Sequence, residues 1–497
     1  DLSLYANTNF KTKALKQKLD EHLVGVAACG LKNAHLLPAF EREPPIAQDI
    51  SALKKRSLKE YQWQDKAVKE IKTWRQKINQ EKYGFFAVNM ASTGCGKTFA
   101  NAKIMQTLST DGKSLRFILA LGLRTLTLQT GDEYRYHVGL DDSELAVLIG
   151  SRAVLELHQQ QKQDEEKDSF EKNGSVSQES LLDEEVDYDC VIPEEGLVTV
   201  LTQDRDKKFL YAPVLACTID HLMAATETKR GGRYILPTLR LMSSDLVIDE
   251  VDDFSGGDLV AIGRLIHLAG MLGRKVMISS ATIPPDLAEG YFKAYRDGWQ
   301  LYCKTRSSSS PVIGCAWVDE FTTNVKSNSE LQVPEAIRTY RDHHKQFVGK
   351  RVVKLRKQPV KRRADIQSCK SIFDKHPNNH NDEDVIQGKQ QAFFELIAMS
   401  AFKKHQQHHT VDKRSQLKVS FGVVRMANIR PCVAFTQYLL SMECNTDTTI
   451  RVMAYHSQQL LLLRHLQEQH LDKVLKRKET GNELPKAFKD KEIRNHL

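Results

Sequence analysis

The chain has 497 residues, enough for two or three domains that each bury their own core. Its 72 Lys and Arg against 63 Asp and Glu give a net charge of +9, which permits a polyanionic partner without requiring one. The nine cysteines show no Cys-x-x-Cys spacing and no apolar run approaches 18 residues. This composition argues against a disulfide scaffold, a zinc module and a membrane protein, and it predicts a cytoplasmic location.

Residues 1–50 predict one helical segment, LKQKLDEHLVGVAACGL, followed by a linker that Pro38, Pro44 and Pro45 indicate. His22, in the run EHLVGVA, is similar to the histidine on the first helix of metal-dependent HD phosphohydrolases. That similarity would make His22 a metal ligand. The HD dipeptide of such proteins is absent from this sequence, so an exposed helical histidine is the alternative.

The stretch FFAVNMASTGCGKTF at residues 85–99 predicts a strand, a glycine-containing loop and the start of a helix, as in a phosphate-binding loop. Backbone N–H groups of small residues can turn toward phosphate oxygens, and the helix start adds its positive dipole end. Lys97 can reach the β- and γ-phosphates, and Thr98 can ligate Mg²⁺. A glycine-rich turn with an incidental lysine is the alternative. The predicted nucleotide-binding residues of the loop are Ser92, Thr93, Gly94, Cys95, Gly96, Lys97 and Thr98.

Polar residues occur on both sides of this loop in the sequence. The segment YQWQDKAVKEI places Gln64 one short helix upstream, where its amide can make two hydrogen bonds to an adenine edge. A plain amphipathic helix is the alternative. Downstream, Arg124 and Thr125 follow a strand at 116–121, and ligands bind at such strand ends in open α/β sheets. We expect both to contact nucleic-acid phosphates, against the alternative of an ordinary loop.

Residues 164–189 differ in kind, with eleven acidic residues against two lysines. This composition predicts a solvated, mobile insertion, and an electrostatic mimic of DNA is the alternative. After it, APVLACTIDHLMAAT predicts a short strand that leads into a helix. Thr218, Asp220 and His221 lie at that junction.

The segment DLVIDEVDDF predicts a buried strand that ends in a pair of carboxylates, Asp249 and Glu250. Asp249 can hold Mg²⁺ through water, and Glu250 can orient an attacking water. Such pairs are common by chance, but this one follows a phosphate-binding loop by about 150 residues. A further strand in KVMISSATIPP is followed by Ser280 and Thr282, whose small hydroxyl side chains can link the acidic pair to a nucleic-acid track.

Four apolar strands, at 85–90, 116–121, 245–248 and 275–279, alternate with helical patterns. This alternation predicts an α/β fold with a mostly parallel, doubly wound sheet that carries its chemistry along one edge.

From about residue 306 we expect a second lobe that begins with a strand in PVIGCAWVDEF. The run at 349–363 carries eight Lys or Arg and no acid, which suits a phosphate-facing surface, with a solvated basic loop as the alternative. His405, His408 and His409 have metal-like spacing, but their polar neighbours favour an exposed helix end. FGVVRMANIRPCVAFTQYLL and IRVMAYHSQQLLLLRH predict two strand-helix units, with Asn428 and His456-Ser457 at the strand ends.

With ASTGCGKT, DEVD and SAT, and with YQWQ and TIDH in the expected order, the chain resembles a superfamily 2 helicase core. The longer segments LKEYQWQDKAV, VNMASTGCGKTFANAKIM, ALGLRTLTLQTG, LACTIDHLM, VIDEVDDF and ISSATIPP together resemble the CRISPR-associated helicase-nuclease of type I systems, most nearly the adaptation-domain-fused subtype I-F form. The resemblance extends over about residues 10–470, and its motifs are specific as a set.

This resemblance implies two RecA-like doubly wound parallel-sheet lobes, the second incomplete, after a short helical remnant of an HD domain. We therefore expect the helical end of an HD-type nuclease domain plus a linker at residues 1–50. A first RecA-like lobe is expected at 51–305, with an acidic insertion at 160–190. A partial second lobe with a basic insertion is expected at 306–497.

The resemblance also implies an ATP-dependent DNA helicase that unwinds invading DNA for degradation after recruitment by a crRNA-guided complex. Its cofactors would be ATP and Mg²⁺, with Thr98 and Asp249 holding the ion through the nucleotide. A divalent transition metal is expected in the nuclease domain of the full-length protein. Single-stranded DNA, the crRNA-guided surveillance complex and the CRISPR adaptation integrase are the implied partners. Thr218 and His221 fall within the family's nucleic-acid-binding set.

One departure from the family concerns arginines. Superfamily 2 motors complete the ATP site with a Q-x-x-G-R-x-x-R type motif, and no such segment occurs before Leu497. Both ends of the sequence look cut, so we expect the arginines in residues beyond it, and we expect this chain by itself to bind nucleotide poorly or to hydrolyse it slowly. Two alternatives stay open: a DEAD-box-like RNA helicase, and a nucleotide-binding recruitment or scaffold subunit without turnover.

Overall fold

The computed structural model describes most of residues 4–467, and its longest gap is 149–203. Shorter gaps occur at 9–11, 42–43, 79–81, 123, 142, 228–233, 255, 307–309, 331, 359–364, 371, 373–382, 412–415, 443–449, 457, 461–462 and 465–466. The acidic insertion expected at 160–190, the end of the basic run, Ser457 and residues 468–497 therefore lie outside the described residues. The chain divides into two compact units, Asp1–Gln358 and Pro359–Leu497.

The first unit is built on one sheet whose strand order, among the described residues, is β10-β9-β3-β8-β7-β4-β6-β5. Every neighbouring pair is parallel except β10 and β9. The predicted α/β class and the mostly parallel sheet are confirmed. The strands are β3 (Gly84–Asn89), β4 (Phe117–Leu121), β5 (Leu145–Leu148), β6 (Val214–Thr218), β7 (Asp245–Asp249), β8 (Val276–Ser279), β9 (Ile313–Val318) and β10 (Thr323–Asn328).

Helices cover both faces of this sheet because its central strands are apolar on both sides. Side chains alternate along a strand, so Phe86 and Val88 enter one core while Phe85 and Ala87 enter the other. The second of these cores is closed by α2 (Ser51–Lys54), α3 (Gln62–Ile78), α4 (Lys97–Leu108) and the π-helical turn Tyr134–Val138 after α5 (Arg124–Glu133). Helices on both faces are the doubly wound arrangement that the sequence predicted.

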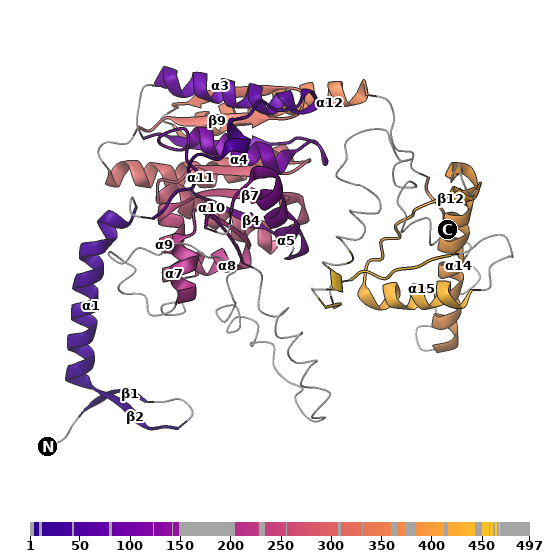
Figure 1. Cartoon of the computed structure of the whole chain (residues 1–497), viewed down its shortest axis with the longest axis horizontal. Coiled ribbons are helices and arrows are strands. Elements are labelled where there is room, and N and C mark those ends of the chain that lie inside the picture. Colours follow the sequence, from indigo (N-terminus) through magenta and orange to yellow (C-terminus); the bar gives the residue numbers. More distant parts are fainter. Residues whose placement is uncertain are drawn as a thin grey trace. The chain divides into compact units, whose positions relative to one another are not determined.

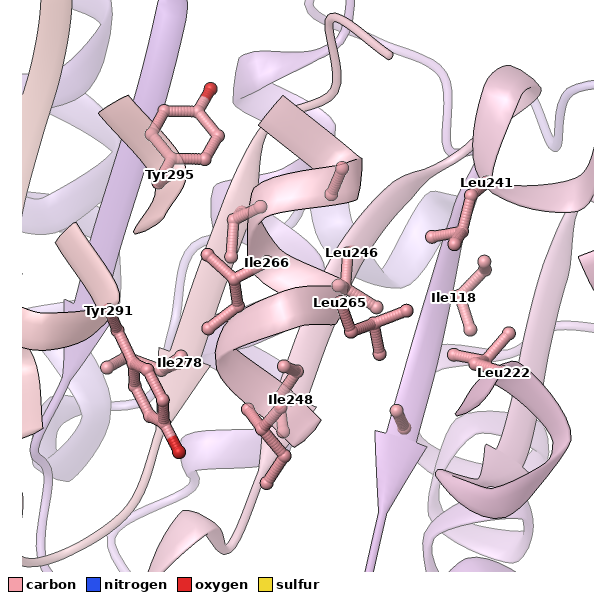
Figure 2. Close-up of a cluster of buried hydrophobic side chains, with 14 of the residues drawn as sticks. Ile118, Leu222, Leu241, Leu246, Ile248, Leu265, Ile266, Ile278, Tyr291 and Tyr295 are labelled. Atoms are coloured by element: carbon pink, nitrogen blue, oxygen red, sulfur yellow. The ribbon is translucent and has the colours of Figure 1, made fainter. Parts of the chain in front are cut away.

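The other core lies under a larger set of helices (Figure 1). Figure 2 shows Leu265 and Ile266 of α10 packed over Ile248 and Ile278 of the sheet. Side chains of this kind, fully removed from water, supply most of the stabilisation of such a sheet. The helices on this face are α7 (Asp204–Tyr211), α8 (Asp220–Met223), α9 (Ile235–Ser243), α10 (Gly257–Met271), α11 (Pro285–Thr305) and α12 (Val333–Arg356).

The segment after residue 306 corrects the expected domain boundary. Strand β9 does not open a second lobe but pairs in parallel with β3, from Gly84 opposite Ile313 to Asn89 opposite Val318. Strand β10 and helix α12 follow in the same unit, which ends at Gln358. Nothing in the local sequence distinguishes a strand that extends one sheet from a strand that begins another.

The N-terminal segment is partly helical, as predicted, but Leu15–Lys18 forms strand β2, which pairs with β1 (Tyr5–Thr8). Helix α1 (Leu19–Phe40) follows, and only Phe40 in it is buried. Among the described helices, α1 alone is long and apolar enough to cross a membrane by length and composition. It carries Asp20, Glu21 and Lys32, and a core helix of a soluble protein or a signal sequence near the N-terminus passes the same test. The absence of a membrane role therefore stays a prediction.

The second unit contains α14 (Glu383–His408), α15 (Ile429–Ser441) and a short ladder of β11 (Thr410–Val411) with β12 (Lys418–Val419). Phe394 of α14 packs against Phe435 of α15 with ring centroids 5.3 Å apart. The helix predicted after Asn428 is present, with Asn428 at its N-cap. The strands predicted before Asn428 and His456 are not: residues 421–428 and 450–456 carry no strand.

Candidate nucleotide-binding site

The phosphate-binding loop lies at the carboxyl end of β3, where the sequence placed it. The loop follows Asn89, and α4 begins at Lys97. Gly94 and Gly96 have φ of +80° and +78°, a region that L side chains rarely adopt. A Cβ on Gly96 would also lie 2.8 Å from Nε2 of Gln64. Glycine is therefore required at position 96 both by backbone conformation and by space.

Lys97 and the acidic pair meet across the sheet edge. Strand β8 lies between β3 and β7, so the loop after β3 and the residues after β7 are two strands apart on the same edge. Lys97 Nζ donates to Glu250 Oε1 at 2.9 Å, and the Lys97 side chain is only 7% exposed. The structure thus brings together three residues that the sequence selected separately, since Asp249 is the last residue of β7.

Asp249 is buried, and burial raises its pKa to about 6, although a hydrogen bond from Ser279 and the charge of Lys97 act in the opposite direction. Its Oδ1 accepts the backbone N–H of Glu250 at 3.0 Å. Glu250 itself has a positive φ of 51°, which is strained for a residue with a side chain. This turn directs one carboxylate inward and the other toward Lys97. A cation beside the buried carboxylate would stabilise its charged form, which suits a bound Mg²⁺.

Three buried polar residues that the sequence analysis did not select connect the loop to the acidic pair. Asn89 Nδ2 donates to Asn101 Oδ1 at 2.8 Å, and Asn101 Nδ2 donates to Ser279 Oγ at 3.1 Å. Ser279 in turn hydrogen-bonds Asp249. Asn89 ends β3 and Ser279 ends β8, so the signal available in the sequence was a polar residue at the end of an apolar strand. Together these residues hold β3, α4, β8 and β7 at fixed positions beneath the site.

Gln64 reaches the loop, as the sequence suggested, but its amide is used within the protein. Its Nε2 donates to the carbonyl oxygen of Gly96 at 3.0 Å, and its Oε1 accepts from Ser57 Oγ at 3.0 Å. Trp63 Nε1 donates to the carbonyl oxygen of Cys95 at 3.2 Å. Contact with an adenine edge would require Gln64 to exchange one of these partners. The placement of Gln64 beside the loop agrees with a role in nucleotide binding, and the adenine contact itself stays a prediction.

Ser280 contacts the last part of the acidic motif rather than Asp249 or Glu250. Its Oγ hydrogen-bonds Oδ1 of Asp252, and the backbone N–H of Thr282 donates to Ser280 Oγ at 3.4 Å. The side chain of Thr282 is exposed. Ser280 thus joins the end of β8 to Asp252, while the link from the acidic pair to a nucleic-acid track stays a prediction.

The expected nucleic-acid-binding residues lie at the same edge of the sheet. Arg124 and Thr125 begin α5 after β4, and Thr218 is the last residue of β6. His221 is buried in α8, two residues after the chain leaves β6. Thr218 is also buried, at 2% exposure. The edge location is as predicted, while contact with a nucleic acid stays a prediction for all four residues.

Glu320 and Arg351 are site residues that the sequence analysis missed. Ser92 Oγ donates to Glu320 Oε1 at 2.7 Å and accepts from Arg351 Nη2 at 2.9 Å. Arg351 lies in the basic run that was expected to face phosphates, but it is buried and paired with Glu320. Asp319 and Glu320 directly follow an apolar strand, which is a pattern that could have indicated a site. The expectation that this strand belongs to a second lobe hid that indication.

His22 hydrogen-bonds Oε1 of Gln17 at 3.2 Å through its Nδ1 atom. Across the described part of the chain, no group of three or more His, Cys, Asp or Glu side chains is arranged to hold a metal ion, and this includes His22 and the histidines at the end of α14. The assignment of His22 to a nuclease metal site stays a prediction.

Comparisons with known proteins agree with the motif-based resemblance. The family described as "Type III restriction enzyme, res subunit" matches residues 57–189. A curated protein of Pseudomonas aeruginosa, the CRISPR-associated nuclease/helicase Cas3 subtype I-F/YPEST, is 37% identical over 99% of this chain and 45% of its own length. The protein of the same name from Pectobacterium atrosepticum is 39% identical over 99% of this chain and 44% of its own length. The resemblance to the subtype I-F helicase-nucleases is confirmed.

Solved structures include a T. fusca Cas3-ADP crystal structure that is 19% identical, with a TM-score of 0.36 over 56% of this chain and 28% of that one. A T. fusca Cas3-AMPPNP structure is 19% identical, with a TM-score of 0.35 over 52% of this chain and 25% of that one. The chain spans less than half the length of the curated relatives that it matches.

Proposed function

We propose that this chain, which resembles the Cas3 subtype I-F/YPEST proteins over 99% of its length, is the ATP-dependent motor of a CRISPR type I nuclease-helicase. The observation that carries the proposal is the bond between Lys97 and Glu250, because it joins the phosphate-binding loop to the acidic pair at one sheet edge. Such an edge, outside the carboxyl ends of parallel strands, is where α/β proteins bind nucleotides.

In this proposal each residue of the site has a separate task. Lys97 neutralises the β- and γ-phosphates of ATP, and the backbone of residues 92–98 surrounds the phosphate oxygens. Thr98 and Asp249 hold Mg²⁺, which supplies charge neutralisation on the phosphates when it is bound. Glu250 orients the attacking water and accepts its proton. Gln64 sits beside Gly96, where it can exchange the carbonyl of that residue for an adenine edge.

The proposed track for nucleic acid runs along the same edge, over Arg124, Thr125, Thr218 and His221. Contacts there are mainly to phosphates, so the motor has little sequence preference. Single-stranded DNA is the proposed substrate because the relatives are named as CRISPR-associated nuclease/helicases. Recruitment by a crRNA-guided surveillance complex, contact with the CRISPR adaptation integrase, a cytoplasmic location and a metal-dependent nuclease domain in the full-length protein belong to the same proposal.

The proposal is tested by DNA-stimulated ATP turnover of the protein with Lys97→Ala. We expect loss of most of the turnover, because the phosphates lose their positive partner. Lys54→Ala is a matched control, since Lys54 forms an exposed ion pair with Asp49 on the same unit. Turnover that is unchanged in Lys97→Ala would rule out the assignment.

Two other functions make different predictions in the same assay. A DEAD-box-like RNA helicase would be stimulated by single-stranded RNA more than by single-stranded DNA. A nucleotide-binding scaffold would bind nucleotide without turnover even in the full-length protein.

A further inference from the structure

Strand β9 places two carboxylates, those of Asp319 and Glu320, beside the start of the phosphate-binding loop. It lies next to β3 in parallel register, and the backbone N–H of Met90 donates to the carbonyl oxygen of Val318 at 2.8 Å. The segments that follow β9 and β3 therefore begin side by side at the same edge of the sheet. Asp319 and Glu320 follow Val318 directly, just as the loop follows Met90.

The carboxylate of Glu320 binds both hydrogen-bond donors of Ser92, its backbone N–H and its hydroxyl group. The backbone N–H of Ser92 donates to Oε2 at 3.2 Å, and Ser92 Oγ donates to Oε1 at 2.7 Å. Two hydrogen bonds from one residue to one carboxylate fix both the position and the orientation of Ser92. The serine hydroxyl is thus engaged with Glu320, although the sequence suggested that Ser92 contacts a nucleotide.

Arg351 closes this arrangement from helix α12, which lies along the sheet beside β9 (Figure 1). Its Nη1 donates to Glu320 Oε2 at 2.6 Å, and its Nη2 donates to Ser92 Oγ at 2.9 Å. The Arg351 side chain is 5% exposed and that of Glu320 is 12% exposed. We refer to Ser92, Glu320 and Arg351 as the Ser92 clamp. Every hydrogen bond in it pairs a donor with an acceptor.

Asp319 adds a second carboxylate beside the same nitrogen atom of Arg351 that Glu320 binds. Its Oδ2 lies 3.4 Å from Arg351 Nη1, and its Oδ1 accepts the backbone N–H groups of Phe321 and Thr322 at 2.7 and 2.6 Å. The guanidinium carbon of Arg351 lies 5.8 Å from the centre of the Phe321 ring. The arginine is therefore held in one orientation by groups on β9 and the turn after it.

The charges of the clamp are matched to a site for a polyphosphate. A carboxylate beside a phosphate-binding loop repels an anionic ligand unless a cation lies next to it. Burial acts to raise the pKa of Glu320, but the hydrogen bonds from Arg351 and Ser92 outweigh it and lower the pKa. Glu320 is thus ionised at neutral pH, and Arg351 offsets its charge.

We propose that Glu320 and Arg351 are positioning residues for the phosphate-binding loop, which they hold at Ser92 in the conformation that accepts the triphosphate. This inference rests on the proposed nucleotide site. The loop contains two glycines with positive φ, and Trp63 and Gln64 hold the carbonyl groups of Cys95 and Gly96 near its end. An anchor at its first residues keeps its N–H groups aimed at the phosphates before a nucleotide arrives, which lowers the ordering cost of binding.

The experiment compares Arg351→Met with Arg341→Met in binding of N-methylanthraniloyl-ATP with Mg²⁺. Both arginines lie on α12 and pair with a glutamate, but Arg341 is exposed and pairs with Glu289 of α11. We expect a Kd at least about tenfold higher for Arg351→Met, from loss of charge-assisted hydrogen bonds, and no change for Arg341→Met. Equal affinity of these two variants would overturn the proposal.

A double-mutant cycle with Ser92→Ala separates positioning from a general loss of stability. Because Ser92 and Arg351 act through one network, the double variant is expected to bind no more weakly than about the worse single variant, whereas additive effects would overturn the proposal. Glu320→Gln serves as a second variant if Arg351→Met does not fold, since a glutamine amide cannot accept from both groups of Ser92. We expect it to raise KM for ATP with kcat within about twofold, and a drop confined to kcat would also count against the clamp.

Lys97→Ala tells this result apart from failure of the proposed function. If the wild-type protein binds the analogue and Lys97→Ala does not, the nucleotide site is correct, and the Arg351→Met result then decides on the clamp alone. If the wild-type protein and Lys97→Ala bind equally, the proposed nucleotide site itself is wrong, and the clamp fails with it.

Discussion

Lys97 Nζ and Glu250 Oε1 lie 2.9 Å apart, although the two residues are 153 positions apart in the sequence. Lys97 is buried and Glu250 is partly buried, so the pair is stronger than an ion pair between two exposed residues. In the proposed mechanism the phosphates of ATP replace Glu250 as the partner of Lys97. The released carboxylate is then available to orient water, which couples nucleotide binding to readiness for hydrolysis.

Replacing Glu250 with glutamine should separate binding from hydrolysis. The variant loses the carboxylate that accepts a proton from water, so we expect ATP turnover to fall by about 100-fold or more. Lys97 loses its charged partner, so nucleotide affinity should stay the same or rise a few-fold. Turnover and equilibrium binding of an ATP analogue measure the two effects. A large loss of affinity would contradict the proposed exchange of partners.

Binding of Mg²⁺ and nucleotide should weaken in acid because of Asp249. Burial raises the pKa of its carboxyl to about 6, and only the ionised form is a good Mg²⁺ ligand. Affinity is therefore expected to approach its full value about one pH unit above 6 and to fall by up to about tenfold per pH unit below 6. Asp249→Asn should bind more weakly at pH 7. Protonation of the nucleotide phosphates affects the wild-type protein and Asp249→Asn equally, so it cancels when their affinities are compared at each pH. Parallel pH profiles of the two proteins would argue against Asp249 as a Mg²⁺ ligand.

Replacing Gly96 and Gly94 with alanine, one at a time, separates the cost of backbone strain in the loop from the cost of a steric clash. Both have positive φ, but a Cβ on Gly96 would lie 2.8 Å from Gln64 Nε2, while a Cβ on Gly94 would meet nothing within 4 Å. Each change to alanine should cost about 1–2 kcal/mol of strain, and Gly96→Ala should also displace Gln64. Unfolding of the nucleotide-free proteins in urea should therefore show the larger loss for Gly96→Ala. Equal losses would mean that Gln64 moves aside without cost.

Ser280→Ala should uncouple unwinding from ATP turnover. The hydroxyl of Ser280 joins the end of β8 to Asp252, and it makes no hydrogen bond to Asp249 or Glu250 in the described structure. We expect DNA-stimulated turnover to remain within about threefold of the wild-type rate while unwinding of a DNA duplex falls further, in line with the loss of one modest hydrogen bond. Proportional loss of both activities would place Ser280 in the hydrolytic step instead.

Arg240 should be a main determinant of stability in the first unit. Its guanidinium is fully buried and donates to the carbonyl oxygens of Leu210, Phe209 and Pro213 at 2.9, 3.3 and 3.2 Å. Arg240→Met removes a buried donor from each of these carbonyls, of which Leu210 keeps Arg116 and Pro213 keeps the backbone N–H of Phe117, so we expect a loss of about 2 kcal/mol in the free energy of unfolding. Arg341→Met, on an exposed arginine, should cost less than about 1 kcal/mol. A similar small loss at Arg240 would show that water or other groups satisfy the carbonyls.

The four central strands of the first sheet, β3, β8, β7 and β4, and the position of the loop were predictable because both depend on local patterns. Apolar runs of four to six residues between helical segments have few other structures open to them, and parallel strands follow from the length of the connections. The carboxyl ends of parallel strands share an edge, so a loop after β3 and an acidic pair after β7 were bound to face the same side.

The partners of these residues were not predictable in the same way. No local pattern predicts that Ser92 binds Glu320 and Arg351, which are 228 and 259 positions away. The strand at 313–318 was expected in a second lobe, because a strand does not encode which sheet edge it joins. Arg351 belongs to a basic run that was expected to face phosphates, with a solvated loop as the alternative. Neither interpretation predicts its burial, because burial of a charge depends on a partner from another element.

The sequence by itself determined the α/β class, the phosphate-binding loop and the identity of Lys97, Asp249 and Glu250, because these depend on residue type and on the direction in which a strand ends. Only the tertiary structure decided that β9 extends the sheet beside β3, that Lys97 hydrogen-bonds Glu250, and that a buried arginine of α12 hydrogen-bonds Ser92. Those features arise from contacts between segments that are distant in the sequence, and such contacts stabilise the protein only when the whole sheet has formed.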